Sequence, residues 1–361
     1  LDLSGTDVFK VRFYEYLRAE KKEGEEIFSE ISQVYKAVDE ASSYDMGQVL
    51  RLYQFYLIAK NDLNKSLYTL NHNTFFDRLF DSLLGVERWP RFDKLANLEL
   101  SLKDWKRVQE SRSAWSIEVY DEANNNSFCC DMHFIWWSRY SRFAHLSVLC
   151  YHHFDRGVTA RFTKELSKVY LVYSVIFKRS INELVNFSYD LVSAITQQDE
   201  TLIFELISKK LLKGKEKFKD RLNKDVFSNA KSKNILLRLS AFLEEEKVSS
   251  LQPLVEKLFR QQIDIEHIEP RNHKDGKLRE DIWEEWGDDL NSIGNLVVLE
   301  RAINRSISNS QYAVKKEFYE SKSIYEVVRK LSREYEVWDL GSCKRRKQAE
   351  IGKLSAYLFG E

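Results

Sequence analysis

The 361-residue sequence is poor in proline, glycine and cysteine, with three, twelve and four of these residues. Few prolines favour long helices, because proline removes a helical hydrogen bond and clashes with the preceding turn. Four cysteines in a chain of this length exclude a disulfide framework, so we expect a reducing, cytoplasmic environment. No apolar run reaches the ~18–20 residues that cross a bilayer, and no signal peptide is visible.

Net charge is also absent, because 56 basic residues balance 56 acidic ones. The whole chain therefore has no general attraction to polyanions, and any nucleic-acid surface must be a local patch. Two basic segments stand out, at 209–219 and 343–353. If DNA binds, we expect phosphate contacts from Lys344, Arg345, Arg346 and Lys347.

What the sequence has in quantity is apolar residues at helical spacing, which continue to about residue 245. We therefore predict a mainly α protein, with a helical scaffold domain at 1–248. The residue pattern changes between about 245 and 255, because the helical spacing of apolar residues ends there and Pro253 and Pro270 follow. A smaller second domain is predicted at 249–361.

The second domain has two candidate strands, in "DIEHI" and "NLVVLE", separated by a helical insert at 278–290 and followed by a helix at 309–323. Side chains alternate between the faces of a strand, so Glu266 and His267 should point to opposite sides. This arrangement suits a metal ligand beside a general base. Asn295 and Asn304 lie further on, in "GNLVVLERAIN".

The pattern Glu-His-Ile-x-Pro, Gly-Asn-Leu and a second Asn resembles the HNH, or ββα-metal, nuclease motif. It is most similar to the C-terminal nuclease domain of GmrSD-type (type IV, modification-dependent) restriction endonucleases. The resemblance covers about residues 232–325. The matching positions are Ile265–Pro270, Trp283 or Trp286, Ile293–Leu296, Leu299, Asn304, Tyr312 (usually Phe), Lys315 and Tyr319.

The resemblance implies a DNA endonuclease or nickase that acts in bacterial defence against phage or other foreign, modified DNA. In that reading His267 activates water, while Glu266 and Asn304 hold Mg²⁺ or Mn²⁺. Asn295 braces the loop that carries the histidine, and Lys315 supports phosphate charge. Glu266 is a mild departure, because many HNH nucleases have Asp there.

The start of the chain is similar to the segment that closes the family's N-terminal domain, at Leu3, Asp7, Val8, Phe9 and Lys10. That domain carries a nucleotide-hydrolysing site with an "Asp-Gly-Gln-Gln-Arg"-type motif, which does not occur in this sequence. The resemblance therefore implies that this chain is the C-terminal part of a longer protein with a sensor domain.

Several simpler readings compete with this one. Lys315 alone reads equally well as a solvated helix lysine, and the whole module as a degenerate site in a helical regulatory or nucleic-acid-binding protein. Cysteine and histidine also gather in "CCDMHF" (129–134) and "CYHHF" (150–154), which raises the possibility of structural zinc. Adjacent pairs do not fit usual zinc spacing, and 135–149 reads as one buried helix, so we expect core packing.

Overall fold

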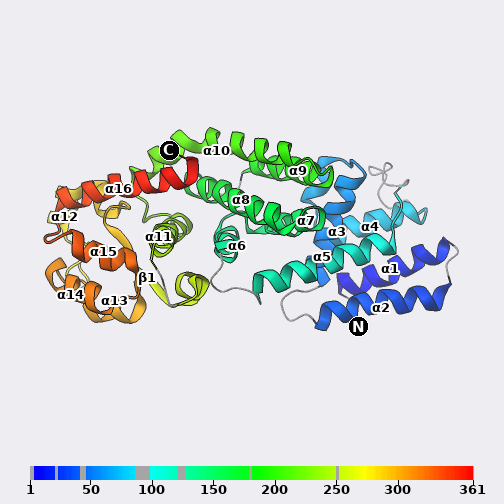
Figure 1. Cartoon of the computed structure of the whole chain (residues 1–361), viewed down its shortest axis with the longest axis horizontal. Helices are drawn as coiled ribbons and strands as arrows, with labels where there is room; N and C mark the ends of the chain where they lie inside the picture. Colours follow the sequence, from blue (N-terminus) through cyan, green and yellow to red (C-terminus); the bar gives the residue numbers. More distant parts are fainter. Residues whose placement is uncertain are drawn as a thin grey trace. The chain divides into compact units, whose positions relative to one another are not determined.

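The computed structural model describes residues 4–20, 23–40, 46–86, 98–120, 127–178, 181–248 and 252–360. Helices dominate this part of the chain, and two short strands form its only sheet (Figure 1). The predicted mainly α class is therefore confirmed. None of the described helices is both long and apolar enough to cross a membrane. Leu3, in the predicted N-terminal similarity, lies outside the described residues.

The chain forms two compact units, each assembled from separate segments. We call residues 1–122, 143–162 and 181–206 the N-terminal unit, and residues 123–142, 163–180 and 207–361 the C-terminal unit. The C-terminal unit thus includes helical residues that precede the expected boundary near 248. That boundary remains a prediction about domains, and the units are described separately below.

Every secondary-structure element in the described residues of the N-terminal unit is a helix. Its helices follow the predicted periodicity, as in α2, where Ile27, Ile31, Val34 and Val38 form one buried stripe. Its elements are α1 (Gly5–Ala19), α2 (Gly24–Glu40), α3 (Met46–Lys60), η1 (Lys65–Thr69), α4 (His72–Leu83), α5 (Leu102–Tyr120), α7 (His145–His153) and α9 (Asn182–Thr196).

Aromatic rings fill the core of the N-terminal unit. Phe9 lies 4.7 Å from Phe76 and 5.1 Å from Trp105, measured between ring centroids. Tyr53 packs edge-on against the same tryptophan at 5.1 Å. Such tilted and edge-to-face pairs add to the stabilisation that burial of the rings provides.

The C-terminal unit contains both strands. Figure 1 shows its elements in green to red. They are α6 (Ser127–Trp137), α11 (Ala230–Glu245), the π-helical turn η4 (Glu256–Arg260), β1 (Ile263–His267), α12 (Glu280–Trp286), η5 (Gly287–Asn291), β2 (Leu296–Glu300), α13 (Arg301–Ile307), α14 (Tyr312–Lys322), α15 (Glu326–Glu334) and α16 (Leu340–Phe359). Helices α8 (Arg156–Ile176) and α10 (Glu200–Leu222) contribute residues to both units.

The two strands agree closely with the predicted ones. They pair antiparallel from Ile263 opposite Glu300 to His267 opposite Leu296. Helix α13 begins directly after β2 and packs against both strands, while α11 and α15 pack against β2. The predicted helical insert and the helix near 309–323 also form, as α12 with η5 and as α14.

The prediction of one helix across 135–149 is wrong. Helix α6 ends at Trp137, and a short 3₁₀ turn, η3 (Ser141–Phe143), separates it from α7. Ser138 explains the break, because its hydroxyl donates to the Ile135 carbonyl at 2.7 Å and accepts from the Tyr140 amide at 3.0 Å. Serine side chains that bind nearby backbone compete with helix continuation.

The cysteines behave as small core residues, as expected. Cys129, Cys130, Cys150 and Cys343 are all buried and free. His133 binds the Cys129 carbonyl at 2.8 Å, which is a local helical contact rather than a metal-type arrangement. The two Cys/His clusters also belong to different compact units, since one precedes residue 142 and the other follows residue 143.

Candidate functional site

His267 lies at the end of β1 and is held by a chain of side-chain hydrogen bonds. Its Nε2 lies 3.0 Å from the side-chain oxygen of Asn291, and the Asn291 amide nitrogen donates to an Asp225 carboxylate oxygen at 3.3 Å. The Asn291 carbonyl also accepts from the Val226 and Phe227 amides, at 3.0 and 3.2 Å. The segment before α11 is thereby joined to η5 beside the histidine.

This chain of contacts fixes the tautomer of the imidazole. The Asn291 nitrogen donates to Asp225, so its oxygen faces His267 and can only accept. Nε2 must therefore carry the proton, which leaves Nδ1 with a free lone pair. Burial lowers the pKa of His267 to about 4, although the Asn291 contact opposes this shift, so the ring is neutral near pH 7.

An aromatic ring and two cations lie next to the imidazole. The Phe227 ring packs on His267 with centroids 4.5 Å apart. The Lys233 Nζ lies 3.5 Å from the Phe227 centroid, and the Arg271 guanidinium lies 5.1 Å from it. Two positive charges therefore lie close to the ring, in a position where they can attract a phosphate group.

Glu266 points to the opposite face of β1, as the strand alternation predicts. It is buried, and its carboxylate forms an ion pair with Lys315 of α14, which is 1% exposed. The Lys315 ammonium also donates to the carbonyls of His267 and Ile268, at 2.6 and 3.2 Å. Burial raises the pKa of Glu266 and lowers that of Lys315, while their mutual attraction opposes both shifts.

Lys315 is therefore not a solvated helix lysine, and that alternative is wrong. Its ammonium is directed at the end of β1, where it fixes the backbone on either side of the bond between His267 and Ile268. The predicted contact with phosphate would require this buried group to leave its present partners.

Asn304 of α13 lies against the strand face that carries Glu266, but its hydrogen-bond partner is Asp264. The Asn304 amide nitrogen donates to an Asp264 carboxylate oxygen at 3.2 Å, and Arg301 Nε contacts the other oxygen at 3.2 Å. Asp264 has 31% of its side chain exposed. It is therefore the most accessible carboxylate on this face of β1, where Glu266 has 10%.

Asn295 holds the backbone that follows His267. Its side-chain nitrogen donates to the carbonyls of Glu269 and Leu290, at 3.0 and 2.9 Å. Its oxygen accepts from the Glu269 amide at 2.8 Å and from the Trp338 indole at 3.1 Å. All of these contacts are made by a fully buried side chain, so Asn295 holds the backbone at Glu269 and Leu290.

Helix α16 presses against the same loop. A Cβ atom added to Gly294 would lie 2.5 Å from the Cys343 carbonyl oxygen and 2.8 Å from Lys347 Cβ. Only glycine permits this approach. Arg346 donates from one guanidinium nitrogen to the carbonyls of Ile293, Gly294 and Leu296, at 2.7–3.0 Å.

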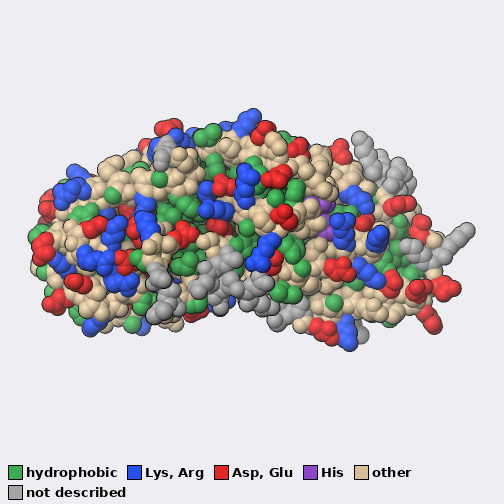
Figure 2. Space-filling view, viewed as in Figure 1, with side chains coloured by type: hydrophobic (Ala, Val, Ile, Leu, Met, Phe, Trp, Pro, Cys, Tyr) green, Lys and Arg blue, Asp and Glu red, His purple; other side chains and the backbone are tan. Residues whose placement is uncertain are grey.

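These contacts change the predicted DNA-binding set. Arg346 is 5% exposed and lies inside the unit, so we withdraw it from the residues that contact the DNA backbone. Lys347 forms an ion pair with Asp289 at 2.5 Å. Lys344 is exposed and lies 3.9 Å from the same carboxylate, and Arg345 is also exposed. On the face drawn in Figure 2, basic and acidic side chains are interspersed, in agreement with the zero net charge.

The Glu266 face of β1 offers few side chains that could bind a divalent cation. No group of three or more His, Cys, Asp or Glu residues in the described ranges is placed to hold a metal. Mg²⁺ often uses only one or two carboxylates and keeps several waters. Asp264 and Asn304 supply adjacent, partly exposed oxygen-bearing side chains, with Glu266 next on the strand face, so their donor chemistry fits a hard cation.

Sequence reasoning missed several residues of this site. Asp225, Phe227 and Lys233 come from the segment around the start of α11, and Asn291 from η5. Asp264 shares a face of β1 with Glu266, but no motif in the sequence marks it as a ligand. The one available signal was its spacing of two residues from Glu266, which puts both carboxylates on one side of β1.

A comparison with known families identifies this part of the molecule. Residues 212–351 match the family model described as GmrSD restriction endonucleases, C-terminal domain. Residues 212–351 are therefore similar to this restriction-endonuclease domain family, which confirms the resemblance seen in the sequence. The match extends beyond the expected 232–325 and includes Asp225 and most of α16. No curated protein matches the chain.

Proposed function

We propose that the C-terminal unit is a divalent-metal-dependent DNA endonuclease or nickase in which His267 is the general base. The observation that carries this proposal is the hydrogen-bond chain from Asp225 through Asn291 to His267. A general base needs a neutral ring with a lone pair in a fixed direction. The hydrogen-bond chain supplies such a lone pair on Nδ1, because it holds the proton on Nε2.

In the proposed reaction His267 Nδ1 takes a proton from a water molecule, which attacks the scissile phosphodiester. Lys233 and Arg271 attract the phosphate to the imidazole, and Phe227 keeps the ring in place. Asn295 and Lys315 hold the backbone on the two sides of the histidine. The strand end is therefore fixed before substrate arrives, which lowers the reorganisation that reaction would require.

We further propose that Glu266 and Asn304, with Asp264, hold Mg²⁺ or Mn²⁺ next to the end of β1. When bound, the cation would polarise the phosphoryl group and stabilise the leaving oxygen. The arrangement of two antiparallel strands followed directly by α13 supports an HNH-like ββα module. Lys344 and Arg345 remain proposed contacts to the DNA backbone.

Similarity to the GmrSD restriction-endonuclease family also supports a role in restriction of foreign or phage DNA in the bacterial cytoplasm, with modified DNA as the substrate. The nucleotide-hydrolysing N-terminal sensor domain implied by the start of the chain is likewise a proposal. Cleavage assays should therefore include modified and unmodified DNA, and the full-length protein where a longer gene product exists.

The test is plasmid nicking with Mg²⁺ or Mn²⁺, comparing wild type with His267→Ala and Asn304→Ala. Loss of the base should lower the rate by about 10²–10⁴-fold. His153→Phe is the matched control, because His153 is another histidine with a lowered pKa, in the N-terminal unit. Equal cleavage by wild type and His267→Ala would remove the catalytic assignment.

A second candidate function is a nucleic-acid-binding or regulatory module without catalysis. The ion pair between Glu266 and Lys315 favours it, because this lysine already neutralises the predicted metal ligand. Binding of duplex DNA that is independent of divalent metal, together with no cleavage of any substrate, would support this function over the nuclease.

A further inference from the structure

A polar pocket lies within the C-terminal unit, away from the strand face that carries Glu266. Its cavity volume is about 230 Å³, and α11, α15, α16 and the turn after α11 contribute its walls. Four cationic side chains and three glutamates line it together with apolar residues. The charged residues are Glu244, Lys247, Lys330, Glu334, Arg346, Glu350 and Lys353.

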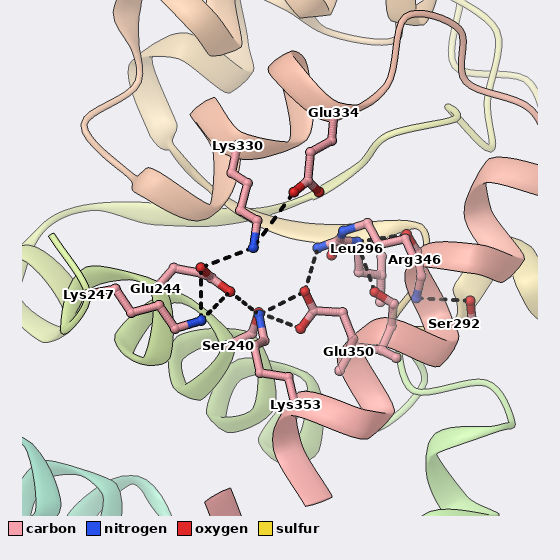
Figure 3. A network of polar contacts seen from close by, with 12 residues as sticks. Ser240, Glu244, Lys247, Ser292, Leu296, Lys330, Glu334, Arg346, Glu350 and Lys353 are labelled. Atoms are coloured by element: carbon pink, nitrogen blue, oxygen red, sulfur yellow. Dashed lines mark hydrogen bonds and ion pairs between the residues drawn. The ribbon is translucent and has the colours of Figure 1, made fainter. Parts of the chain in front are cut away.

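Positive charge exceeds negative charge by one over the whole of this pocket. Figure 3 shows Glu244 surrounded by lysines, and its carboxylate lies 3.3 Å from Lys247, 3.3 Å from Lys330 and 3.1 Å from Lys353. Burial opposes the ionisation of Glu244, yet these three lysines lower its pKa. One carboxylate is therefore shared by three ammonium groups.

The second inner glutamate is also shared. Glu350 accepts from Lys353 at 2.9 Å and from Ser240 at 2.7 Å, and Arg346 Nη2 lies 3.8 Å from it. The third glutamate, Glu334, has 52% of its side chain exposed and lies at the rim beside Lys330. The pocket as a whole thus holds four cations against three carboxylates, with Lys247 and Lys330 at the rim beside Glu334.

One buried donor in this pocket lacks a hydrogen bond. Arg346 Nη2 has no hydrogen-bond partner among the described residues, although its neighbour Nη1 donates to three carbonyls of the loop at 293–296. A buried guanidinium nitrogen without an acceptor is costly. A small anion with several oxygens would supply that acceptor and offset the excess positive charge.

We propose that this pocket binds a small phosphate-type anion, either free phosphate or the phosphate chain of a small molecule, and that Arg346 joins it to the loop around Asn295. The exposed Lys247 and Lys330 would meet the anion at the rim, and Arg346 Nη2 would meet it inside. A DNA backbone fits less well, because the donor that lacks a partner is buried and Glu334 repels a long polyanion at the rim.

Arg346 makes the pocket relevant to the candidate active site. The carbonyls that it binds flank Asn295, and Asn295 in turn binds both backbone groups of Glu269, two residues after His267. An anion on Nη2 would restrain the guanidinium and, through Nη1, the loop. Arg346 is thus a positioning residue, since it touches neither the base nor the proposed metal ligands in the structure.

The first experiment measures pyrophosphate binding by isothermal titration and thermal unfolding, at constant ionic strength. Wild type should bind, and Lys330→Gln should bind about tenfold more weakly, because one charge-assisted contact is lost. The matched control is Lys316→Gln, which also removes a lysine paired with a glutamate but lies outside the pocket. Equal affinity in all three proteins would overturn the proposal.

Further arms separate the sources of binding. Sodium chloride that raises the melting temperature as much as pyrophosphate would reduce the effect to ionic strength and overturn the proposal. Displacement of pyrophosphate by a short duplex DNA, with Lys330→Gln defective in DNA binding, would assign the pocket to the DNA backbone and overturn the small-anion assignment. Retained pyrophosphate binding in the presence of duplex supports it.

The link to the loop has its own measurement. Hydrogen exchange of a peptide spanning 290–299 should slow when wild type is saturated with pyrophosphate. Lys330→Gln should show little slowing at the same concentration, while Lys316→Gln should match wild type. Exchange that does not change on pyrophosphate binding would remove the proposed role of Arg346.

Discussion

Each unit contains a histidine whose pKa is lowered to about 4, chiefly by desolvation, although His153 is only half-buried and His267 is buried. Their surroundings differ. His153, in the N-terminal unit, stacks on Tyr56 with centroids 6.2 Å apart, and neither ring nitrogen has a hydrogen-bond partner among the described residues. His267, in the C-terminal unit, is oriented by Asn291 and lies near two cations. A lowered pKa alone therefore does not distinguish a site from a core.

The same contrast extends to buried charge. Among buried described residues of the N-terminal unit, charged or histidine side chains are limited to Asp81, Arg112 and His152. The C-terminal unit has a longer set, namely Asp131, Arg238, Glu244, Glu245, Lys257, Glu266, His267, Lys315, Arg346 and Glu350. Buried charges cost free energy unless they are paired and hydrogen-bonded. The C-terminal unit therefore depends on specific pairs far more than the aromatic core does.

The largest effect on stability is expected for Lys315→Met. This change leaves the Glu266 carboxylate buried without its partner and removes donors to the carbonyls of His267 and Ile268. The free energy of unfolding should fall by about 3–5 kcal/mol. Chemical denaturation followed by circular dichroism measures the change.

Lys316→Met is the matched control for this prediction. Lys316 is the next residue, but its partner Glu336 has 89% of its side chain exposed, so the cost should stay below about 1 kcal/mol. The double variant Glu266→Gln, Lys315→Met should recover part of the loss, because no charge remains unpaired. Similar effects of the two lysine variants would contradict the distinction between buried and exposed pairs.

A smaller effect, on activity, is expected for Asn291→Leu. The variant keeps His267 but removes the acceptor that holds the proton on Nε2. Cleavage should slow by about 10–100-fold. This reduction is larger than the loss of one hydrogen bond would cause and smaller than the loss of the base would cause. The pH dependence of the rate should also shift, because the Asn291 contact raises the pKa of His267.

Asn234→Leu serves as the comparison, since the Asn234 side chain donates to the Ala230 carbonyl within its own helix. It should leave both the rate and its pH profile unchanged. A rate loss in Asn291→Leu without any shift of the pH profile would indicate a general packing defect and would count against an orienting role.

The smallest effect is expected for His153→Phe. The unfolded chain binds more protons than the folded one between pH 6.5 and about 4, because the folded-state pKa is lowered across that window. Wild-type stability therefore falls as pH falls from 6.5 towards 4. The variant lacks this titrating group, so its free energy of unfolding at pH 5 should exceed that of wild type by about 1 kcal/mol. This value is reduced because His153 is partly exposed.

Thermal unfolding at pH 7.5 and pH 5 measures this difference. The advantage of His153→Phe should be larger at the lower pH, and plasmid nicking should be unchanged at either. A variant that is less stable than wild type at pH 5 would show that the His153 ring makes contacts that phenylalanine cannot replace.

The sequence predicted those features that depend on local periodicity. The strands at Ile263–His267 and Leu296–Glu300, and helices such as α2 and α11, follow the spacing of apolar residues. The opposite directions of Glu266 and His267 follow from strand alternation. The similarity to a restriction-endonuclease family followed from residues at fixed spacing within one stretch of chain.

The partners of these residues could not be predicted in the same way. Asp225 and Asn291 reach His267 from segments 42 and 24 residues away, and no short motif links them, although their contacts fix the tautomer. The helix expected across 135–149 is interrupted for a local reason, because the Ser138 hydroxyl competes for backbone groups and the apolar spacing does not show this. Arg346 was predicted to contact DNA but is buried, because a run of basic residues does not show which of its side chains points inward.

The contact between α16 and Gly294 also has a consequence for the order of folding. Residues 340–359 are translated about forty positions after the loop that they press against, and Arg346 supplies donors to three carbonyls of that loop. During synthesis the strands can pair earlier, yet the loop beside His267 lacks its clamp until α16 has left the ribosome. A nascent chain should therefore remain without a completed site until the residues of α16 have been synthesised.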